Sequence, residues 1–266
     1  MDKICKSIRL KTLDVLYKSQ ASHLGTSMSC VEILVAIYSL LDCDKIISKK
    51  NDRCRVFVSK GHAAASTYAV MNYFGLITDE ELNTYHLDGS NLCGHVSHAV
   101  DCVEHSTGAL GHGMPVAVGS AIGLKSQNFK NSRSIAICGD GELQEGSIWE
   151  ALMLAAHCNL DNFCLIIDYN KISSITSTNS VSNLEPLKKK FESFSCICKI
   201  ADGHDVFKIK KTIKMNMFKK KPLVVICNTV KGKDVPFAEN QPIWHYRSLD
   251  KKLYEEAKRY LNNYEK

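Results

Sequence analysis

An acidic side chain and an amide side chain, each following an apolar run, are candidates for binding a divalent cation. Gly139-Asp140-Gly141-Glu142 comes directly after SIAIC, and Asn170 follows FCLIID. Mg²⁺ takes oxygen ligands in proteins, usually one or two carboxylates together with phosphate oxygens. The glycines beside Asp140 allow the main chain to approach a diphosphate and to donate N–H groups to it. Because Gly-Asp-Gly is also a common turn, the metal interpretation depends on the two segments meeting in space.

Histidines beside glycines form a second set of candidate reactive groups. The pattern occurs in SHLG at His23, in Gly61-His62, in Gly94-His95 and in Gly111-His112, and His245 follows Trp244. A single histidine is more often structural than catalytic, but several in loops bordering glycine turns indicate proton transfer or anion binding. The glycine cluster at 107–113 precedes an apolar helical pattern, which fits either a phosphate-binding turn or an ordinary loop-to-helix junction.

The elements that must position these groups alternate between strand-like and helical patterns, which is typical of an α/β fold: a parallel sheet with helices on both faces. Short apolar runs bounded by turn residues predict strands at 55–58, 134–138, 163–168, 196–200 and 223–227. Apolar residues at three- and four-residue spacing predict helices at 3–18, 30–41, 63–74, 113–125, 147–158, 206–218 and 249–261. Ligands bind at the carboxyl ends of strands in such sheets. We therefore expect Asp140 and Asn170 at one edge of a single domain spanning residues 1–266.

Composition and cysteine spacing favour a cytoplasmic globular protein. The chain has 266 residues, of which 45% are hydrophobic and 23% charged, an ordinary globular composition. No apolar segment follows the charged N-terminus, and Glu32 interrupts the apolar stretch at 31–41, so neither a secretory signal nor a membrane span is expected. The twelve cysteines lie singly in apolar runs without a CxxC pair. This spacing favours reduced, buried thiols over disulfides or a zinc site.

The positive net charge is concentrated in one segment. The whole chain carries +6, and residues 188–221 contain eleven lysines but only three acidic residues. These lysines lie at the ends and along one side of periodic segments and are not interleaved with aromatic side chains. A solvated face is therefore favoured over a nucleic-acid-binding surface, and we expect no nucleic-acid partner.

The longest motif resembles that of a known cofactor-binding family. The run GDGELQEGSIWEALMLAAHCNLDNFCLIIDYNKI is similar to the thiamine diphosphate motif, which begins with Gly-Asp-Gly and ends with Asn. SHLGTSMS, VFVSKGHAAASTYA and VEHSTGALGHG resemble three active-site loops of transketolases, and LEPLKKKFESF, DGHD and NTVKGKDVPFAENQPIWH resemble later landmarks. The matches keep the family's order over most of the chain. The resemblance implies a thiamine diphosphate-binding fold, and within it the diphosphate-binding domain.

The resemblance also implies how the cofactor is held. Asp140, Asn170 and the main-chain carbonyl of Ile172 would bind Mg²⁺, which would bridge to the diphosphate of thiamine diphosphate. The diphosphate itself would be contacted by Gly141, His62 and His245. Gly108 and Leu110 would contact the aminopyrimidine through their main-chain atoms.

Further roles implied by the resemblance concern proton transfer and assembly. His23, His95 and His245 would line the channel to the thiazolium carbon, where they would shuttle protons or bind substrate hydroxyls. Glu145 would belong to an acidic cluster at the subunit interface.

Four substitutions and one segment depart from the family pattern. Leu24 stands where Pro is commonest, Ser22 where Gly is frequent, Asp234 where Gly is usual and Tyr246 where Gly is common; SSITST replaces an acidic, glycine-containing segment. The metal and diphosphate ligands are intact. The resemblance therefore implies cofactor binding more strongly than any one substrate.

In the family, the glutamate that hydrogen-bonds the aminopyrimidine lies in a second, pyrimidine-binding domain, whereas this sequence ends at Lys266. We therefore expect the N-terminal subunit of a split transketolase, active only with a C-terminal subunit, in an α2β2 heterotetramer. The expected reaction transfers a two-carbon ketol unit from a ketose or ketose phosphate to an aldose. A related enzyme of the deoxyxylulose phosphate synthase type, and a non-catalytic partner-binding subunit, are the alternatives.

Overall fold

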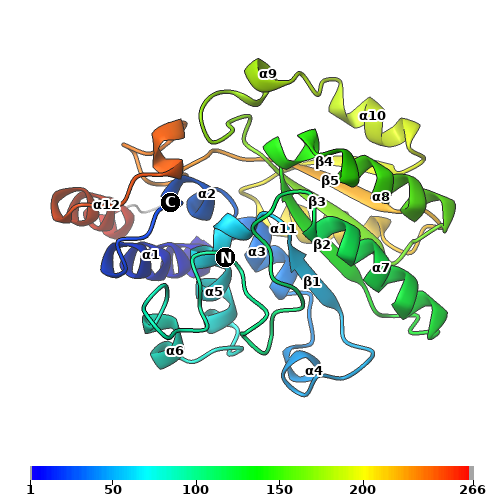
Figure 1. The fold of residues 1–266 in the computed structure, drawn as a ribbon, viewed down its shortest axis with the longest axis horizontal. Helices are drawn as coiled ribbons and strands as arrows, with labels where there is room; N and C mark the ends of the chain where they lie inside the picture. The colour runs from blue at the N-terminus through cyan, green and yellow to red at the C-terminus, as the bar shows by residue number, and fades with distance from the viewer. Residues whose placement is uncertain (1, 264–266) are drawn as a thin grey trace.

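The centre of the fold is a parallel sheet, seen in a computed structural model that describes residues 2–263 (Figure 1). Its strands are β1 (Arg55–Val58), β2 (Ser134–Gly139), β3 (Phe163–Tyr169), β4 (Ile197–Asp202) and β5 (Leu223–Asn228). Their order across the sheet is β1-β2-β3-β5-β4, and every neighbouring pair is parallel. The predicted fold class is confirmed, and each predicted strand is present with small changes at its ends.

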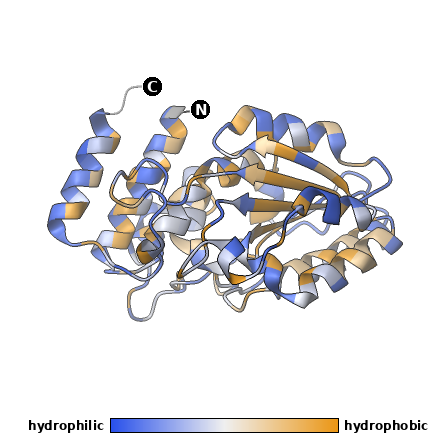
Figure 2. Ribbon diagram, turned by 90° about the horizontal axis from the view of Figure 1, so that it is seen from above, coloured by the Kyte–Doolittle hydropathy of each residue, from blue (hydrophilic) through white to orange (hydrophobic). Residues whose placement is uncertain are grey.

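Most strand residues are apolar because both faces of the sheet are covered, whereas the edge strand β4 also carries the exposed residues Lys199 and Ile200. On β2, Ile135 and Ile137 belong to one hydrophobic core, whereas Ala136 and Cys138 belong to the other. Figure 2 shows these hydrophobic strands lying between helices that carry both hydrophilic and hydrophobic residues.

The two cores contain side chains from different helices. The first core contains side chains from α1 (Asp2–Lys18), α2 (Leu24–Ser29), α3 (Val31–Tyr38), α4 (Cys43–Ile47), α5 (Ala64–Tyr73), α6 (Asp79–Asn83), α11 (Val206–Asn216) and α12 (Lys251–Asn263). The second contains side chains from α7 (Gly113–Ser126), α8 (Gly146–His157) and α10 (Leu187–Ser193). The remaining short elements are α9 (Thr178–Val181) and the 3₁₀ turns Gly61–Ala63, Gly141–Gln144 and Pro242–His245.

The long helices confirm the sequence prediction, and the short ones were missed. The helix expected at 30–41 begins at Val31 and ends at Tyr38, and α2 precedes it, with Cys30 (φ −108°, ψ 12°) between the two. α4, α6, α9 and α10 were also not predicted. Helices this short are marginal by themselves and form because tertiary contacts hold them, so their local sequences carry little periodic signal.

All twelve cysteines are free thiols, and seven of them are buried. The expectation of buried thiols therefore holds for these seven, whereas Cys93 is exposed and the other four are partly exposed. Within residues 2–263, no helix has the length and apolar content needed to cross a bilayer.

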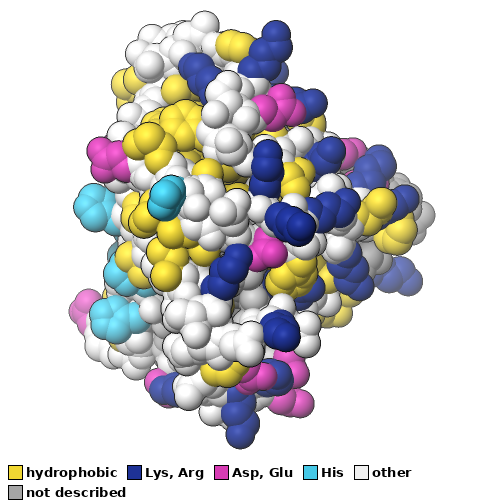
Figure 3. All heavy atoms as spheres, turned by 90° about the vertical axis from the view of Figure 1, so that its right-hand side faces the viewer, with side chains coloured by type: hydrophobic (Ala, Val, Ile, Leu, Met, Phe, Trp, Pro, Cys, Tyr) yellow, Lys and Arg dark blue, Asp and Glu magenta, His cyan; other side chains and the backbone are white. Residues whose placement is uncertain are grey.

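Most lysines of the 188–221 segment are exposed, as predicted. On the face of the molecule drawn in Figure 3, lysine and arginine side chains are interspersed with hydrophobic side chains and fewer carboxylates.

Candidate functional site

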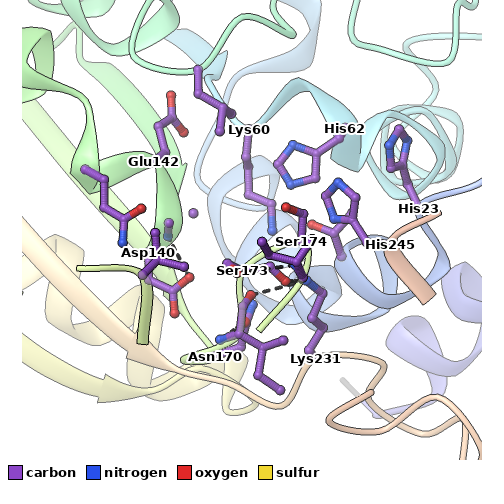
Figure 4. Close-up of a pocket in the computed structure, with 18 of the residues that line it drawn as sticks. His23, Lys60, His62, Asp140, Glu142, Asn170, Ser173, Ser174, Lys231 and His245 are labelled. Atoms are coloured by element: carbon purple, nitrogen blue, oxygen red, sulfur yellow. Dashed lines mark hydrogen bonds between the residues drawn. The ribbon is translucent and has the colours of Figure 1, made fainter. Parts of the chain in front are cut away.

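A cavity of about 340 Å³ lies at the carboxyl edge of the sheet. Residues that follow four of the strands line it: Lys60 after β1, Asp140 after β2, Asn170 after β3 and Lys231 after β5. Figure 4 shows these side chains together with three histidines from loops outside the sheet. The edge of the sheet therefore gathers both charges and titratable rings around one space.

Every residue to which the family resemblance assigns a role lines this cavity, whereas His112, the other histidine singled out beside a glycine, is exposed and does not. The residues with assigned roles are His23, His62, His95, Gly108, Leu110, Asp140, Gly141, Glu145, Asn170, Ile172 and His245. The structure thus brings them together, while their individual roles remain predictions. Glu145 is exposed at the start of α8.

The ends of β2 and β3 are joined through Asp140. Gly139 pairs with Asp168 in the parallel ladder, and the main-chain N–H of Asp140 donates to the carbonyl of Asp168 at 3.2 Å. The Asp140 carboxylate accepts from the Gly141 N–H at 2.8 Å and, with its other oxygen, from the Lys171 N–H. One side chain therefore bridges both strand ends at the floor of the cavity.

The oxygen-bearing groups after β3 are held close to a cation of the protein itself. The Asn170 amide oxygen accepts from the Ile172 N–H at 3.1 Å. The Lys231 ammonium donates to the main-chain oxygens of Ile172, at 3.2 Å, and Ser173, at 2.7 Å. These carbonyls are thus turned toward a position that favours positive charge.

The donor set fits a divalent cation with a phosphate-bearing ligand. Asp140 is only 4% exposed, and burial, followed by the nearby Asp168 charge, raises the pKa of its carboxyl to about 7. A buried anion of this kind is stabilised when a cation is bound beside it. A Cβ added to Gly141 would meet only the Ser173 side chain, at 3.9 Å, and one added to Gly139 would meet nothing within 4 Å. The main chain therefore leaves open space where a diphosphate would approach.

A buried ion pair between Lys60 and Asp168 lies close to Asp140. Lys60 and Asp168 contact each other with side chains that are 1% and 0% exposed, and Ser29 and Thr229 hydroxyls donate to the same carboxylate. Burial disfavours the charged forms, but the pair holds the pKa of Lys60 above its usual range and that of Asp168 below it. Lys60, Asp168 and Lys231 were not predicted as site residues from the sequence.

Four histidine rings from separate segments surround the cavity. The His23 ring lies 5.1 Å from that of His245, 5.2 Å from that of His95 and 5.7 Å from that of His62, between ring centroids. The His62 and His245 centroids are 5.2 Å apart. His23 has a left-handed backbone (φ 72°) directly before α2.

The rings are kept neutral near pH 7. Burial, followed by the charge of His95, lowers the pKa of His23 to about 4. Burial and the charge of Lys231 lower the pKa of His245 to about 3, and burial lowers the pKa of His62 well below its usual range. The Nδ1 atom of His245 is buried without a hydrogen-bond partner among the described residues. A neutral imidazole has one donor and one acceptor nitrogen, so the ring cluster can hydrogen-bond to the hydroxyl groups of a bound molecule.

The glycine-rich loop before α7 packs tightly against the end of β1. A Cβ on Gly61 would lie 2.6 Å from the carbonyl carbon of Thr107 and 2.7 Å from the nitrogen of Gly108. The Glu142 carboxylate accepts from the Gly111 N–H at 3.0 Å and from the Ser59 hydroxyl. This packing places Gly108, with φ 151°, at the cavity wall, and Glu142 was not among the predicted site residues.

Tyr246 lies at the mouth of the cavity. Its side chain is 63% exposed, and its ring packs edge-on against that of His245 with centroids 4.7 Å apart. The departure from Gly at this position therefore places an aromatic ring where an incoming molecule would pass.

Comparison with known proteins identifies the family of this chain. Residues 1–264 match the model of the transketolase thiamine diphosphate-binding domain. The chain is 38% identical over 253 residues to one of the subunits of the apulose-4-phosphate transketolase of Actinobacillus succinogenes, covering 93% of this chain and 90% of that one. It is 32% identical to a 6-deoxy-6-sulfo-D-fructose transketolase subunit of a Clostridium species, covering 94% and 92%.

Among solved structures, the transketolase of Campylobacter jejuni superposes with a TM-score of 0.89 at 29% identity. The superposition covers 98% of this chain but 42% of that one. The chain therefore spans about two fifths of that transketolase.

Proposed function

The chain belongs to the transketolase family, through the thiamine diphosphate-binding domain, and on that premise we propose that it is the N-terminal subunit of a two-chain transketolase. Its relatives support this assignment, since the chain matches about nine tenths of the length of two proteins that are named as transketolase subunits. Residues 1–266 would form one cytoplasmic domain. The missing part of the catalytic centre would come from a C-terminal subunit in an α2β2 assembly.

The observation that carries the proposal is the convergence of Asp140, Asn170 and the Ile172 carbonyl at adjacent strand ends, beside open space at Gly141. These three groups would hold Mg²⁺ with phosphate oxygens completing its coordination. The diphosphate would be contacted by Gly141, His62 and His245, with the Lys231 ammonium balancing its charge. The main chain at Gly108 and Leu110 would face the aminopyrimidine.

When bound, thiamine diphosphate supplies a thiazolium that stabilises the negative charge created as a ketose is cleaved. The protein's task is to orient the reactants, to move protons and to exclude water. His23, His95 and His245 would bind substrate hydroxyls and exchange protons with them. Their lowered pKa values leave the rings neutral near pH 7, so each ring has one donor and one acceptor nitrogen for these hydroxyls. Glu145 would face the partner subunit from the rim of the cavity.

The proposed reaction is transfer of a two-carbon ketol unit from a ketose or ketose phosphate to an aldose. The relatives are named for apulose 4-phosphate and for 6-deoxy-6-sulfo-D-fructose, a sugar phosphate and a sulfonated sugar, which supports an anionic ketose as the donor. Tyr246 and the 173–178 segment would contribute to the choice between sugars.

The experiment is reconstitution from purified subunits. This chain, its C-terminal partner and their mixture are assayed for ketol transfer with added thiamine diphosphate and Mg²⁺. We expect activity only in the mixture, together with a complex of two copies of each chain by light scattering. Activity of this chain by itself would refute the two-chain proposal. A stable complex that binds cofactor but has no ketol-transfer activity would favour the non-catalytic alternative, and condensation of pyruvate with an aldose phosphate would favour the deoxyxylulose phosphate synthase type.

A further inference from the structure

From the buried contacts behind the cavity, we infer that His204 is a positioning residue that sets the place of Lys231 by holding the main chain of Val230. The inference rests on the proposed function, because Lys231 matters there as a contact of the cofactor diphosphate. His204 belongs to the DGHD motif, follows β4 and is not among the residues that line the cavity. Any effect of His204 on a bound ligand must therefore pass through the residues that it holds.

Each nitrogen of the His204 ring has its own partner. Nε2 accepts from the Val230 N–H at 2.9 Å, and Nδ1 lies 3.0 Å from a carboxylate oxygen of Glu32. Because Nε2 accepts a hydrogen bond from the main chain, it carries no proton, so the single ring proton resides on Nδ1 and is donated to Glu32. The ring thus links α3 to the segment that carries Lys231 in one defined orientation.

Glu32 is itself fixed by a buried ion pair. The Arg9 guanidinium donates to both Glu32 carboxylate oxygens at 2.6 and 2.9 Å, and both side chains are buried. Arg9 also donates to the main-chain oxygens of Met28 and Lys233, each at 3.3 Å. The same cluster therefore fixes α2, which follows His23, and the segment on the far side of Lys231.

The segment after β5 is tightly packed, so a displacement of its main chain would create steric clashes. The Gly232 N–H donates to the Gly25 carbonyl at 2.8 Å, and a Cβ at Gly232 would lie 2.3 Å from the Ala238 oxygen. Asp234 keeps the left-handed backbone (φ 64°) that explains why Gly is usual there, and its carboxylate lies 3.4 Å from Arg9 Nε. Asp234, which stands where Gly is usual in the family, thus joins the Arg9–Glu32 cluster that holds this segment.

Lys231 is one residue from the atom that His204 holds. Its ammonium reaches the Ile172 and Ser173 carbonyls across the cavity, and its side chain is buried. Without the Val230 contact, one end of the Lys231 backbone loses its anchor, while the Gly232 contact remains. We therefore expect the ammonium to be less well placed for an anion even though the fold persists.

Two substitutions of His204 separate its two contacts. His204→Asn retains a donor at the position of Nδ1, toward Glu32, but has no acceptor for Val230. His204→Gln reaches the position of Nε2 and retains the acceptor. Both variants remove the same ring, so they form a matched pair with similar losses of packing.

The binding measurement is calorimetric titration of Mg²⁺ and thiamine diphosphate into the full chain with its C-terminal subunit. We expect His204→Asn to weaken binding about five- to tenfold, the effect of one lost hydrogen bond, and His204→Gln to stay within about twofold of the unsubstituted protein. The midpoint temperature of thermal unfolding should fall by similar amounts in both variants. The inference would be overturned if both variants lost affinity equally, or if neither variant lost any.

A double-mutant cycle with Lys231→Met tests whether the effect passes through Lys231. His204→Asn should cause little further loss of affinity when Lys231 is already replaced, because the two effects share one route. Fully additive losses would contradict a positioning role and indicate a general effect on the fold.

A ligand-free readout distinguishes this inference from the proposed function. Hydrogen exchange at Val230–Gly232 should be faster in His204→Asn than in His204→Gln. Unchanged exchange refutes the positioning role whether or not cofactor binds. If the unsubstituted complex binds no thiamine diphosphate, the proposed function fails, and the role of His204 toward a diphosphate fails with it.

Discussion

The main-chain N–H of His23 donates to the main-chain carbonyl of His245 at 3.2 Å, and the centroids of the two rings are 5.1 Å apart. The contact joins the segment before α2 to the last 3₁₀ turn, so two distant parts of the sequence present their imidazoles to the same cavity. The partial burial of both rings, together with the nearby Lys231 ammonium, lowers the pKa of each and makes protonation unfavourable.

This relationship predicts that the ligand-free chain loses stability as the pH falls from about 6.5 toward 4. In the unfolded chain a histidine titrates near 6.5, whereas His23 and His245 have pKa values of about 4 and about 3 in the folded chain. Between these values the unfolded state binds more protons, so protonation favours unfolding. Urea unfolding at pH 7 and pH 5 measures the loss.

The matched variants for this prediction replace rings inside and outside the cavity. Combining His23→Asn with His245→Gln should give a shallower dependence of the unfolding free energy on pH, whereas His112→Gln, at an exposed ring, should leave it unchanged. An identical slope in all three proteins would show that other groups dominate acid unfolding.

Asp140→Asn should remove the affinity for Mg²⁺ and thiamine diphosphate together. The substitution keeps the side-chain shape but removes the negative charge that lies between the two strand ends. Since even indirect supports of metal ligands are worth about 10–100-fold in affinity, we expect a loss above about 100-fold by calorimetry with the partner subunit present. Asp101→Asn, at an exposed carboxylate, is the control. Unaltered binding in Asp140→Asn would exclude the proposed metal site.

Gly61→Ala should destabilise the chain and loosen the loop that carries Gly108. The new methyl group would meet main-chain atoms of Thr107 and Gly108 at 2.6–2.7 Å, and such overpacking costs about 1–3 kcal/mol or more. Gly119→Ala in α7 has nothing within 4 Å and should instead stabilise the chain by about 0.5–1 kcal/mol. Thermal unfolding of both variants checks the opposite signs, and a tolerated Gly61→Ala would contradict the close packing.

Lys60→Met should lower the free energy of unfolding by about 3–5 kcal/mol, because it leaves the buried Asp168 carboxylate without its counter-ion. Adding Asp168→Asn should recover part of that loss. Lys49→Met, which breaks an exposed pair with Asp101, should change stability by less than about 1 kcal/mol. Urea unfolding of the four proteins gives the comparison, and equal effects of Lys60→Met and Lys49→Met would mean that the buried pair adds nothing.

The sheet and the meeting of Asp140 with Asn170 could be predicted because they follow from apolar runs and from the common direction of parallel strands. The order of the strands could not. β5 lies between β3 and β4, which brings Lys231 beside Ile172, whereas nothing in the local sequence of β4 or β5 specifies which of them joins β3.

The buried lysines escaped prediction for a related reason. Lys60 and Lys231 each precede a glycine, in a chain with 34 lysines and arginines, and only tertiary packing distinguishes them from the solvated lysines at 188–221. α2 was missed because the residue before it, His23, has a left-handed backbone and makes no side-chain cap, so the helix lacks the usual signals of a helix start.

The polar lining of the cavity comes mostly from loops and turns, several of them directly after strands, while the two hydrophobic cores lie along the strands and beneath the helices. The stability of the fold and the contacts to a bound molecule thus depend on different parts of the chain. Under the proposed function, a rim residue such as Tyr246 could change together with the sugar that is bound, while the residues of the two hydrophobic cores stay the same.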